Sequence, residues 1–215
     1  MLNKSYFTSI VIVLNNVPKY LDNLLKNVVN QGEQLGEYEV IIINNIPLKK
    51  QSQDFTEIIK KYQVINRKNL EFREIYTTIL DICQGEILIF FDGNYCPDED
   101  WLEQIINPFQ DSKINVVAGE ICTVKNDHMF KKLSNLYHKF ISKNKFPRNN
   151  FYDHQIANIA LRKDFIKQQK YLNLTTINPK EISFYYRILR EIESEIIYNT
   201  SAIVYDYKLD IVDRT

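Results

Sequence analysis

The stretch GEILIFFDGNYCPDEDW, residues 85–101, joins a continuous apolar run to an acidic turn. Residues 87–91 are all apolar, which is typical of a strand buried on both faces. Asp92, Gly93 and Asn94 follow at once. The pattern predicts a core strand that delivers Asp92 to an open edge of a sheet.

Two more apolar runs precede it, SIVIVL at residues 9–14 and YEVIII at residues 38–43, and each ends in a pair of asparagines. Between them, PKYLDNLLKNVVNQ at residues 18–31 spaces its apolar residues as an amphipathic helix does. This order predicts a strand, a helix and a second strand.

Strands and helices continue to alternate along the chain. The later expected helices are at residues 53–62, 70–83, 97–109, 129–141, 163–170 and 179–191, and the later strands at 63–66, 87–91, 114–124, 156–161 and 201–207. Apolar strands alternating with helices indicate an α/β fold with a mixed, mainly parallel sheet flanked by helices. Such sheets bind ligands at the carboxyl ends of their strands.

The composition limits the classes of function. Lys plus Arg and Asp plus Glu both number 27 among 215 residues, so no basic excess points to nucleic acid or an anionic membrane. The first apolar run is too short to span a membrane. Three cysteines without metal-ligand spacing argue against disulfides or structural zinc and fit a cytoplasmic protein. With five glycines and no Gly-rich phosphate loop, kinases, other NTPases and dehydrogenases are disfavoured.

From residue 9 to residue 207, the order of elements resembles the family-2 glycosyltransferases of the GT-A fold. SIVIVLNNVPKYLDNLLKNVVNQ looks like the family's first strand, its turn with Asn16 at the usual Asn, and its first helix. YEVIIINN resembles the second strand, where the family has an Asp that contacts the nucleotide base. Asn44 stands at that position.

NLEFREIYTTILDICQGEILIFFDGN resembles the family's stretch that ends in an Asp-x-Asp motif. Asn69 and Asp92 match it, and Asn94 replaces the last Asp. Glu71 and Thr77 replace a Gly and an Asn of the family pattern.

The acceptor side of the family is also recognisable. IANIALRKDFI resembles it with Asn158 and Arg162 in place. In PKEISFYYRILREIESEIIYNTSAIVYDY, Glu181 falls at the catalytic-base position and Arg187 matches. Lys180 replaces an acidic residue, and Asp206 replaces a frequent His.

The resemblance implies a single GT-A-like domain, residues 1–215, with a nucleotide-binding half at about 8–110 and an acceptor half at about 111–215. It implies transfer of a sugar, with inversion, from a nucleotide-diphosphate sugar to a hydroxyl acceptor in polysaccharide or glycoconjugate assembly. Mn²⁺ or Mg²⁺ would be the cofactor, and a protein partner or homo-oligomer is compatible with it. The implied site residues are Glu181 as base, Asn16, Asn44, Asn69, Asp92 and Asn94 for the nucleotide sugar, Asn158, Arg162, Lys180 and Arg187 on the acceptor and diphosphate side, and Asp92, Asn94 and Asp206 for the metal.

Each role has a structural alternative. Asp92 is a ligand or a turn cap before Gly93, and Asp206 restores the carboxylate lost at position 94 or is a polar strand end. Glu181 is the base or an ordinary residue of a helix's first turn, and Lys180 could face the diphosphate. At Asn44 an amide, which both donates and accepts hydrogen bonds, could alter base preference or abolish nucleotide binding.

Two functions remain open from the sequence. The first is an active inverting glycosyltransferase that retains Asp92, Glu181 and Arg187. The second is a catalytically impaired relative that acts as a binding or partner-regulating module, since several departures fall on ligand-side motifs.

Overall fold

The computed structural model describes residues 6–18, 20–66, 78–123, 158–168 and 196–206. These residues form an eight-stranded sheet in the order β3-β2-β1-β4-β7-β6-β8-β5. The strands are β1 Thr8–Leu14, β2 Tyr38–Asn44, β3 Gln63–Asn66, β4 Ile87–Asp92, β5 Tyr95–Pro97, β6 Val116–Thr123, β7 Asn158–Arg162 and β8 Ile196–Asp206.

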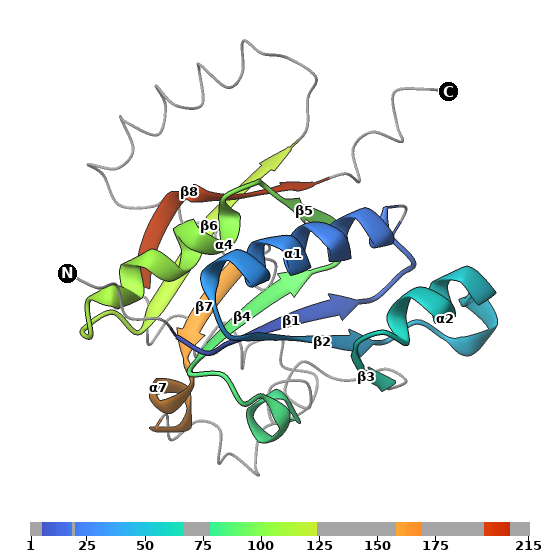
Figure 1. Ribbon diagram of the computed structural model, residues 1–215, viewed down its shortest axis with the longest axis horizontal. Coiled ribbons are helices and arrows are strands. Elements are labelled where there is room, and N and C mark those ends of the chain that lie inside the picture. The colour runs from blue at the N-terminus through green and yellow to red at the C-terminus, as the bar shows by residue number, and fades with distance from the viewer. Residues whose placement is uncertain (1–5, 19, 67–77, 124–157, 169–195, 207–215) are drawn as a thin grey trace, which may run out of the picture.

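Helices cover the sheet (Figure 1). They are α1 Leu21–Leu35, α2 Gln53–Ile59, α4 Trp101–Ile106 and α7 Lys163–Gln168, with 3₁₀ turns η1 Leu48–Lys50 and η2 Asn107–Gln110. Residues 78–82 are also helical. None of the helices within the described ranges has the length and apolar character needed to cross a membrane.

The sheet is mixed. β1 pairs in parallel with β2 and β4, β2 with β3, and β6 with β8, whereas β7 runs antiparallel to both β4 and β6. The expected α/β architecture with flanking helices is therefore confirmed.

Side chains of the central strands alternate between two apolar layers. On one side, which we call the α1 face, residues such as Ile12 and Phe91 pack with α1, α2 and α4. On the other, the α7 face, residues such as Val13 and Phe90 pack with Ile79 and Ile166. Because both layers are buried, polar residues reach solvent mainly where these strands end.

Some boundaries differ from the predicted ones. α1 begins at Leu21, three residues after Pro18, and the helix at Trp101 continues past Ile106 as a 3₁₀ turn that contains Pro108. The sequence did not predict β5, because a three-residue strand that ends in Pro has no periodic pattern. The helices expected at 129–141 and 179–191, and most of that at 70–83, lie outside the described residues.

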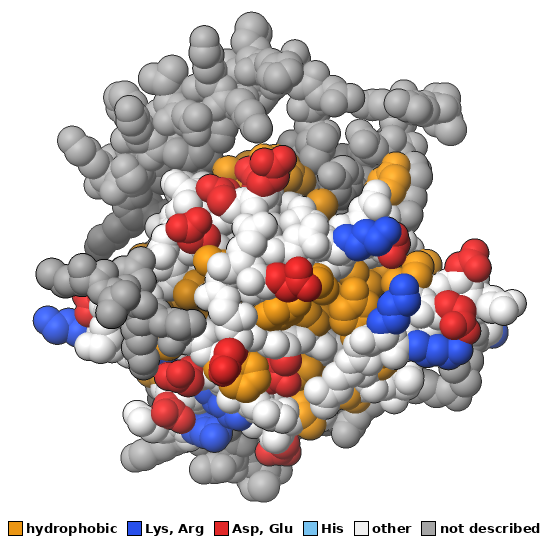
Figure 2. Space-filling model, viewed as in Figure 1, with side chains coloured by type: hydrophobic (Ala, Val, Ile, Leu, Met, Phe, Trp, Pro, Cys, Tyr) orange, Lys and Arg blue, Asp and Glu red, His pale blue; other side chains and the backbone are white. Residues whose placement is uncertain are grey.

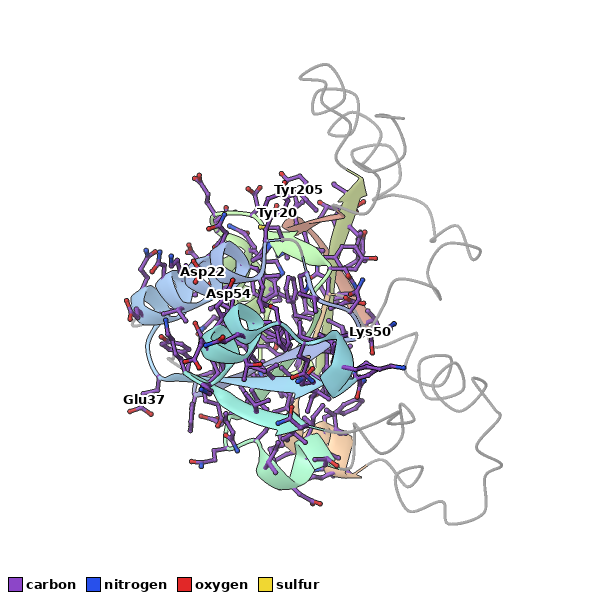
Figure 3. All side chains as sticks on the ribbon, turned by 90° about the vertical axis from the view of Figure 1, so that its right-hand side faces the viewer. Tyr20, Asp22, Glu37, Lys50, Asp54 and Tyr205 are labelled. Carbon is purple, nitrogen blue, oxygen red and sulfur yellow. The ribbon has the colours of Figure 1, made fainter. Side chains whose placement is uncertain are left out.

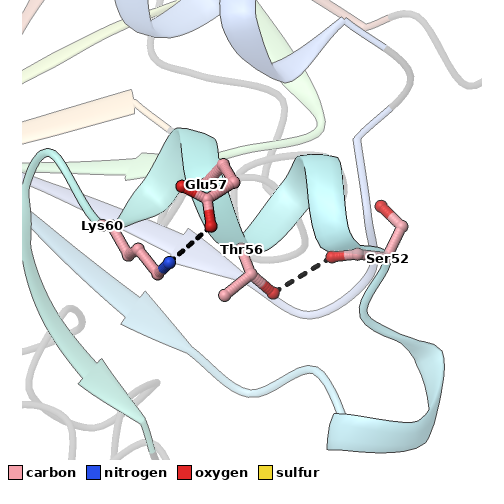
Figure 4. A network of polar contacts seen from close by, with 4 residues as sticks. All are labelled: Ser52, Thr56, Glu57 and Lys60. Atoms are coloured by element: carbon pink, nitrogen blue, oxygen red, sulfur yellow. Dashed lines mark hydrogen bonds and ion pairs between the residues drawn. The ribbon is translucent and has the colours of Figure 1, made fainter.

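α2 has a capped start. The Ser52 hydroxyl accepts a hydrogen bond from the Phe55 backbone N–H at 3.1 Å. The Thr56 hydroxyl donates to the Ser52 carbonyl at 3.0 Å, as Figure 4 shows. The Ser52 hydroxyl satisfies one of the backbone N–H groups that a helix start leaves unpaired.

Gly85 allows β4 to enter the sheet close to β1. A Cβ at this position would lie 2.5 Å from the Ser9 backbone nitrogen and 2.8 Å from the Thr8 carbonyl carbon. The Gly85 N–H also donates to the Ser9 hydroxyl at 2.8 Å. Any larger residue would push the strands apart.

We therefore expect Gly85→Ala to lower the free energy of unfolding by about 2–3 kcal/mol, because backbone atoms cannot yield to the added methyl group. Denaturant unfolding followed by circular dichroism measures this. The neighbouring Gln84→Ala, at an exposed position, should change it by less than about 0.5 kcal/mol. Equal midpoints for the two variants would contradict the close approach.

Candidate functional site

The carboxyl ends of β2, β1 and β4 lie side by side. Leu14 pairs with Asn44, and Val13 pairs with Asp92. Figure 3 looks onto this edge of the sheet. The edge predicted from the sequence is thus formed, and Asp92 lies at its centre.

Asp92 and Asn94 form a closed turn. The Asp92 Oδ1 atom accepts from the Asn94 backbone N–H at 2.9 Å and from the Asn94 side-chain amide at 2.6 Å. The Asp92 Oδ2 atom receives no hydrogen bond from any described residue. Asp92 therefore caps the turn with one oxygen, and no described residue bonds the other.

Asp206 lies next to this turn along the backbone. It pairs with Tyr95, the residue directly after Asn94. Strand pairing thus brings the backbone positions 92, 94 and 206 to one end of the sheet.

The oxygen atoms of Asp92 and Asn94 are of the kind that Mg²⁺ and Mn²⁺ prefer. Across the ranges that the structure describes, no three His, Cys, Asp or Glu side chains come together as a metal cluster. A cation here would have the Asp92 carboxylate as its main protein ligand, with the Asn94 carbonyl and position 206 beside it.

The side chain of Asn44 is committed to the protein. Asn44 is 2% exposed, its Nδ2 donates to Asn66 Oδ1 at 2.8 Å, and its Oδ1 accepts from the Ile46 N–H at 3.1 Å. This geometry gives no support to the expected contact of Asn44 with a base. The amide instead ties β2 to β3.

Asn45 is a residue that the sequence reasoning missed. It continues the alternation of β2 onto the α7 face, and its Nδ2 donates to Asn15 Oδ1 at 3.0 Å. Its own Oδ1 is buried and has no hydrogen-bond partner. A buried acceptor without a donor is costly, and Asn45 lies at the same edge as Asp92. The signal in the sequence was the second Asn of the pair.

The side-chain amide of Asn158 is fully hydrogen-bonded within the protein. It is 2% exposed; both amide hydrogens are used, by the carbonyls of Glu120 at 2.9 Å and Ala202 at 2.8 Å, and its Oδ1 accepts from Trp101 Nε1 at 2.8 Å. It lies on the α1 face and joins α4, β6 and β8. Its role is to hold these elements together.

The predicted position of Arg162 on the acceptor or diphosphate side is wrong. Because β7 is antiparallel to β4, Arg162 pairs with Ile87 at the amino end of β4, about 17 Å along the strand from Asp92. Its guanidinium donates to the carbonyls of Ile114 and Phe109 at 2.8 and 2.6 Å and stacks on the Tyr6 ring. It stabilises the opposite end of the sheet rather than the acceptor or diphosphate side.

Asn16 is exposed in the turn after β1. Asn69, Lys180, Glu181 and Arg187 lie outside the described residues.

A surface hollow of about 330 Å³ lies between α1 and α2. Its lining includes the exposed Val17 and Tyr20 together with Asp22 of α1 and Asp54 of α2. Figure 3 shows Asp22 and Asp54 close to one another, whereas Lys50 points away from them. Hydrophobic side chains also gather on this face in Figure 2. Asp92 does not line this hollow.

Comparison with known proteins places this geometry in a family. The profile of glycosyl transferase family 2 matches residues 9–169. The chain belongs to this family.

Curated relatives match about half of the chain. Glycosyltransferase AglE of Haloferax volcanii is 26% identical over 124 residues, covering 54% of this chain and 39% of the relative. Beta-monoglucosyldiacylglycerol synthase of Nostoc sp. is 27% identical over 117 residues, covering 52% and 25%. The chain thus spans well under half the length of either relative.

Solved structures show the same fold. Mannosyltransferase PcManGT of Pyrobaculum calidifontis, in complex with GDP-Man and Mn²⁺, superposes with a TM-score of 0.62 at 11% identity, covering 94% of this chain and 57% of the other. Glucosyl-3-phosphoglycerate synthase of Mycobacterium tuberculosis, in complex with Mn²⁺, UDP-Glc and phosphoglyceric acid, gives 0.55 at 12% identity, covering 95% and 74%. The fold of the family-2 chain is GT-A.

The turn at Asp92 generates a prediction. Asn94→Asp replaces the amide that donates to Asp92 with a second carboxylate, so like charges meet when no cation is present. We expect the metal-free variant to unfold about 2–4 °C lower, which corresponds to about 1 kcal/mol. We expect its Mn²⁺ affinity to rise at least about tenfold, because carboxylates bind such cations better than amides.

Thermal unfolding and calorimetric titration with Mn²⁺ measure both effects. Asn107→Asp, the same charge change at an exposed position distant from Asp92, serves as the control. Equal Mn²⁺ affinity in the two variants would exclude position 94 from the cation site.

Proposed function

We propose that this chain transfers a sugar, with inversion, from a nucleoside diphosphate sugar to a hydroxyl acceptor in the assembly of a glycan or glycoconjugate. The observation that carries the proposal is the position of Asp92, at the end of a buried central strand and with one carboxylate oxygen uncommitted, in a family-2 chain. Transfer leaves charge on a departing diphosphate, and a cation held at Asp92 would offset it.

The nucleobase would lie beside Asn45 and Asn15. Their side-chain amides meet at the exposed end of β1 and β2, and amides both donate and accept hydrogen bonds, as the edges of a nucleobase do. The two related structures were determined with GDP-Man and with UDP-Glc. These donors are therefore the first to test.

A divalent cation, Mn²⁺ or Mg²⁺, would be held by Asp92 with Asn94 and Asp206 beside it. When bound, it would offset the charge of the diphosphate leaving group. The residues of the chain supply the oxygen ligands and fix their orientation through the hydrogen bonds of the turn.

The remaining roles rest on the resemblance in sequence. Glu181 would take the proton from the acceptor hydroxyl. Lys180 and Arg187 would face the diphosphate, and Asn16 and Asn69 would contact the nucleotide sugar.

A second candidate is a relative that binds nucleotide sugars or partners without transfer. It is favoured by Asn94, which adds a neutral amide where a second carboxylate would strengthen the cation site. Nucleotide binding without release of nucleotide from the donor sugars would identify this case.

The test is calorimetric titration with UDP, GDP, CDP and dTDP, each with and without Mn²⁺. We expect UDP or GDP to bind in a Mn²⁺-dependent way, and at 100 times its dissociation constant to stabilise the protein by about 2.7 kcal/mol. Asp92→Asn should weaken this binding at least about tenfold, whereas Asp81→Asn, which is exposed, should not. Failure of all four nucleotides to bind would contradict the proposal.

A further inference from the structure

A second carboxylate lies level with Asp92 on the same face of the sheet. Ala118 of β6 pairs with Ile159 of β7, and Ile159 pairs with Phe90 of β4, so these three form one row. β6 and β4 run in the same direction because both are antiparallel to β7. Two residues further along each strand, Glu120 and Asp92 are therefore level, and alternation places both on the α7 face.

The separation of the two positions is two strand spacings, about 10 Å. Asn45, Asn15, Asp92 and Glu120 thus follow one another across the carboxyl ends of β2, β1, β4 and β6. These strands span four spacings, about 19 Å. That is the span of an extended ligand laid across the edge rather than of a single ion.

The Glu120 side chain is partly buried and oriented by a tyrosine. The Tyr198 hydroxyl, on the neighbouring β8, donates a hydrogen bond to Glu120 Oε2. Burial raises the pKa of Tyr198, and the charge of Glu120 raises it further, so the hydroxyl remains a donor at neutral pH.

The main chain at Glu120 is also fixed. Asn158 donates to the Glu120 carbonyl from the α1 face. Next to it, a Cβ on Gly119 would lie 2.3 Å from Asn158 Nδ2 and 2.3 Å from the Ala202 carbonyl, so only glycine fits. The register between β6 and β8 shifts at this point. Packing thus determines where the Glu120 carboxylate lies.

The order of groups along the edge matches the order of parts in a nucleotide sugar. Under the proposed function the base would lie beside Asn45 after β2 and the cation and diphosphate at Asp92 of β4, and the Glu120 carboxylate lies beyond them on β6. Carboxylates accept hydrogen bonds from sugar hydroxyls, and a charged acceptor makes these bonds stronger than a neutral one does.

We propose that Glu120, positioned by Tyr198, hydrogen-bonds the hydroxyl groups of the transferred sugar and so contributes to donor-sugar specificity. This inference rests on the proposed function. It assigns the sugar end of the donor to β6, whereas the nucleotide end lies at β1, β2 and β4.

Binding measurements separate the two ends without any acceptor. UDP is compared with UDP-Glc, and GDP with GDP-Man, by calorimetry at a fixed Mn²⁺ concentration. We expect the wild type to bind one nucleotide sugar more tightly than its nucleoside diphosphate. In Glu120→Gln, affinity for that nucleotide sugar should fall about tenfold or more, whereas affinity for the diphosphate should stay within about twofold.

Two further variants complete the experiment. Tyr198→Phe leaves the carboxylate but removes its orientation, so it should reduce only the sugar-dependent part of binding, by about two- to threefold. Glu103→Gln, an exposed carboxylate on α4, should change neither affinity. Retained diphosphate binding in each variant shows that it is folded.

The outcomes are distinct. If neither diphosphate nor nucleotide sugar binds the wild type, the proposed function fails and this inference falls with it. If diphosphates bind but the sugar adds no affinity, or if Glu120→Gln binds both ligands as the wild type does, Glu120 does not contact the sugar. Equal losses for both ligands would make Glu120 a structural residue and would also overturn the proposal.

Discussion

The alternation of side chains along β4 is the constraint on which the site depends. β4 lies between β1 and β7, and its residues from Ile87 to Phe91 are buried on both faces. Asp92 must therefore emerge at the carboxyl end and on the α7 face, the side of its partner Val13. A shift of one residue would direct the carboxylate into the layer beneath α1. The close approach at Gly85 and the pairing with β1 hold this register.

The apolar runs in the sequence were sufficient to predict β1, β2 and β4 and the edge they share. They were not sufficient to predict whether Asn44 or Asn45 lies on the same face as Asp92. A strand that is apolar on both faces does not reveal which face its last residue occupies. The register of β2 against β3 and the hydrogen bond between Asn44 and Asn66 show which face each asparagine occupies. Glu120 is a charged residue inside an apolar run. This pattern could have marked it as a residue of the site, but it was not among the predicted site residues.

Strand direction explains the error at Arg162. A short apolar segment looks the same whether it runs parallel or antiparallel to its neighbour, and β7 runs antiparallel to β4. Its first residue, Asn158, is therefore near the carboxyl edge, and its last is near the amino edge. Asn158 then acts through the backbone of β6 rather than on a ligand.

Asn94 shows how the edge differs from one with two carboxylates. Its amide donates to Asp92 and so keeps the turn closed without a cation. A carboxylate there would repel Asp92 until a cation bound. The chain thus has a preformed turn with one carboxylate rather than two.

The most direct test of the account is the anomalous diffraction signal of Mn²⁺ in crystals of the protein with UDP-Glc or GDP-Man. The account predicts a peak within about 2.5 Å of an Asp92 carboxylate oxygen, with the ligand extending across the α7 face from Asn45 to Glu120. A peak elsewhere, or a nucleotide in the hollow between α1 and α2, would contradict it.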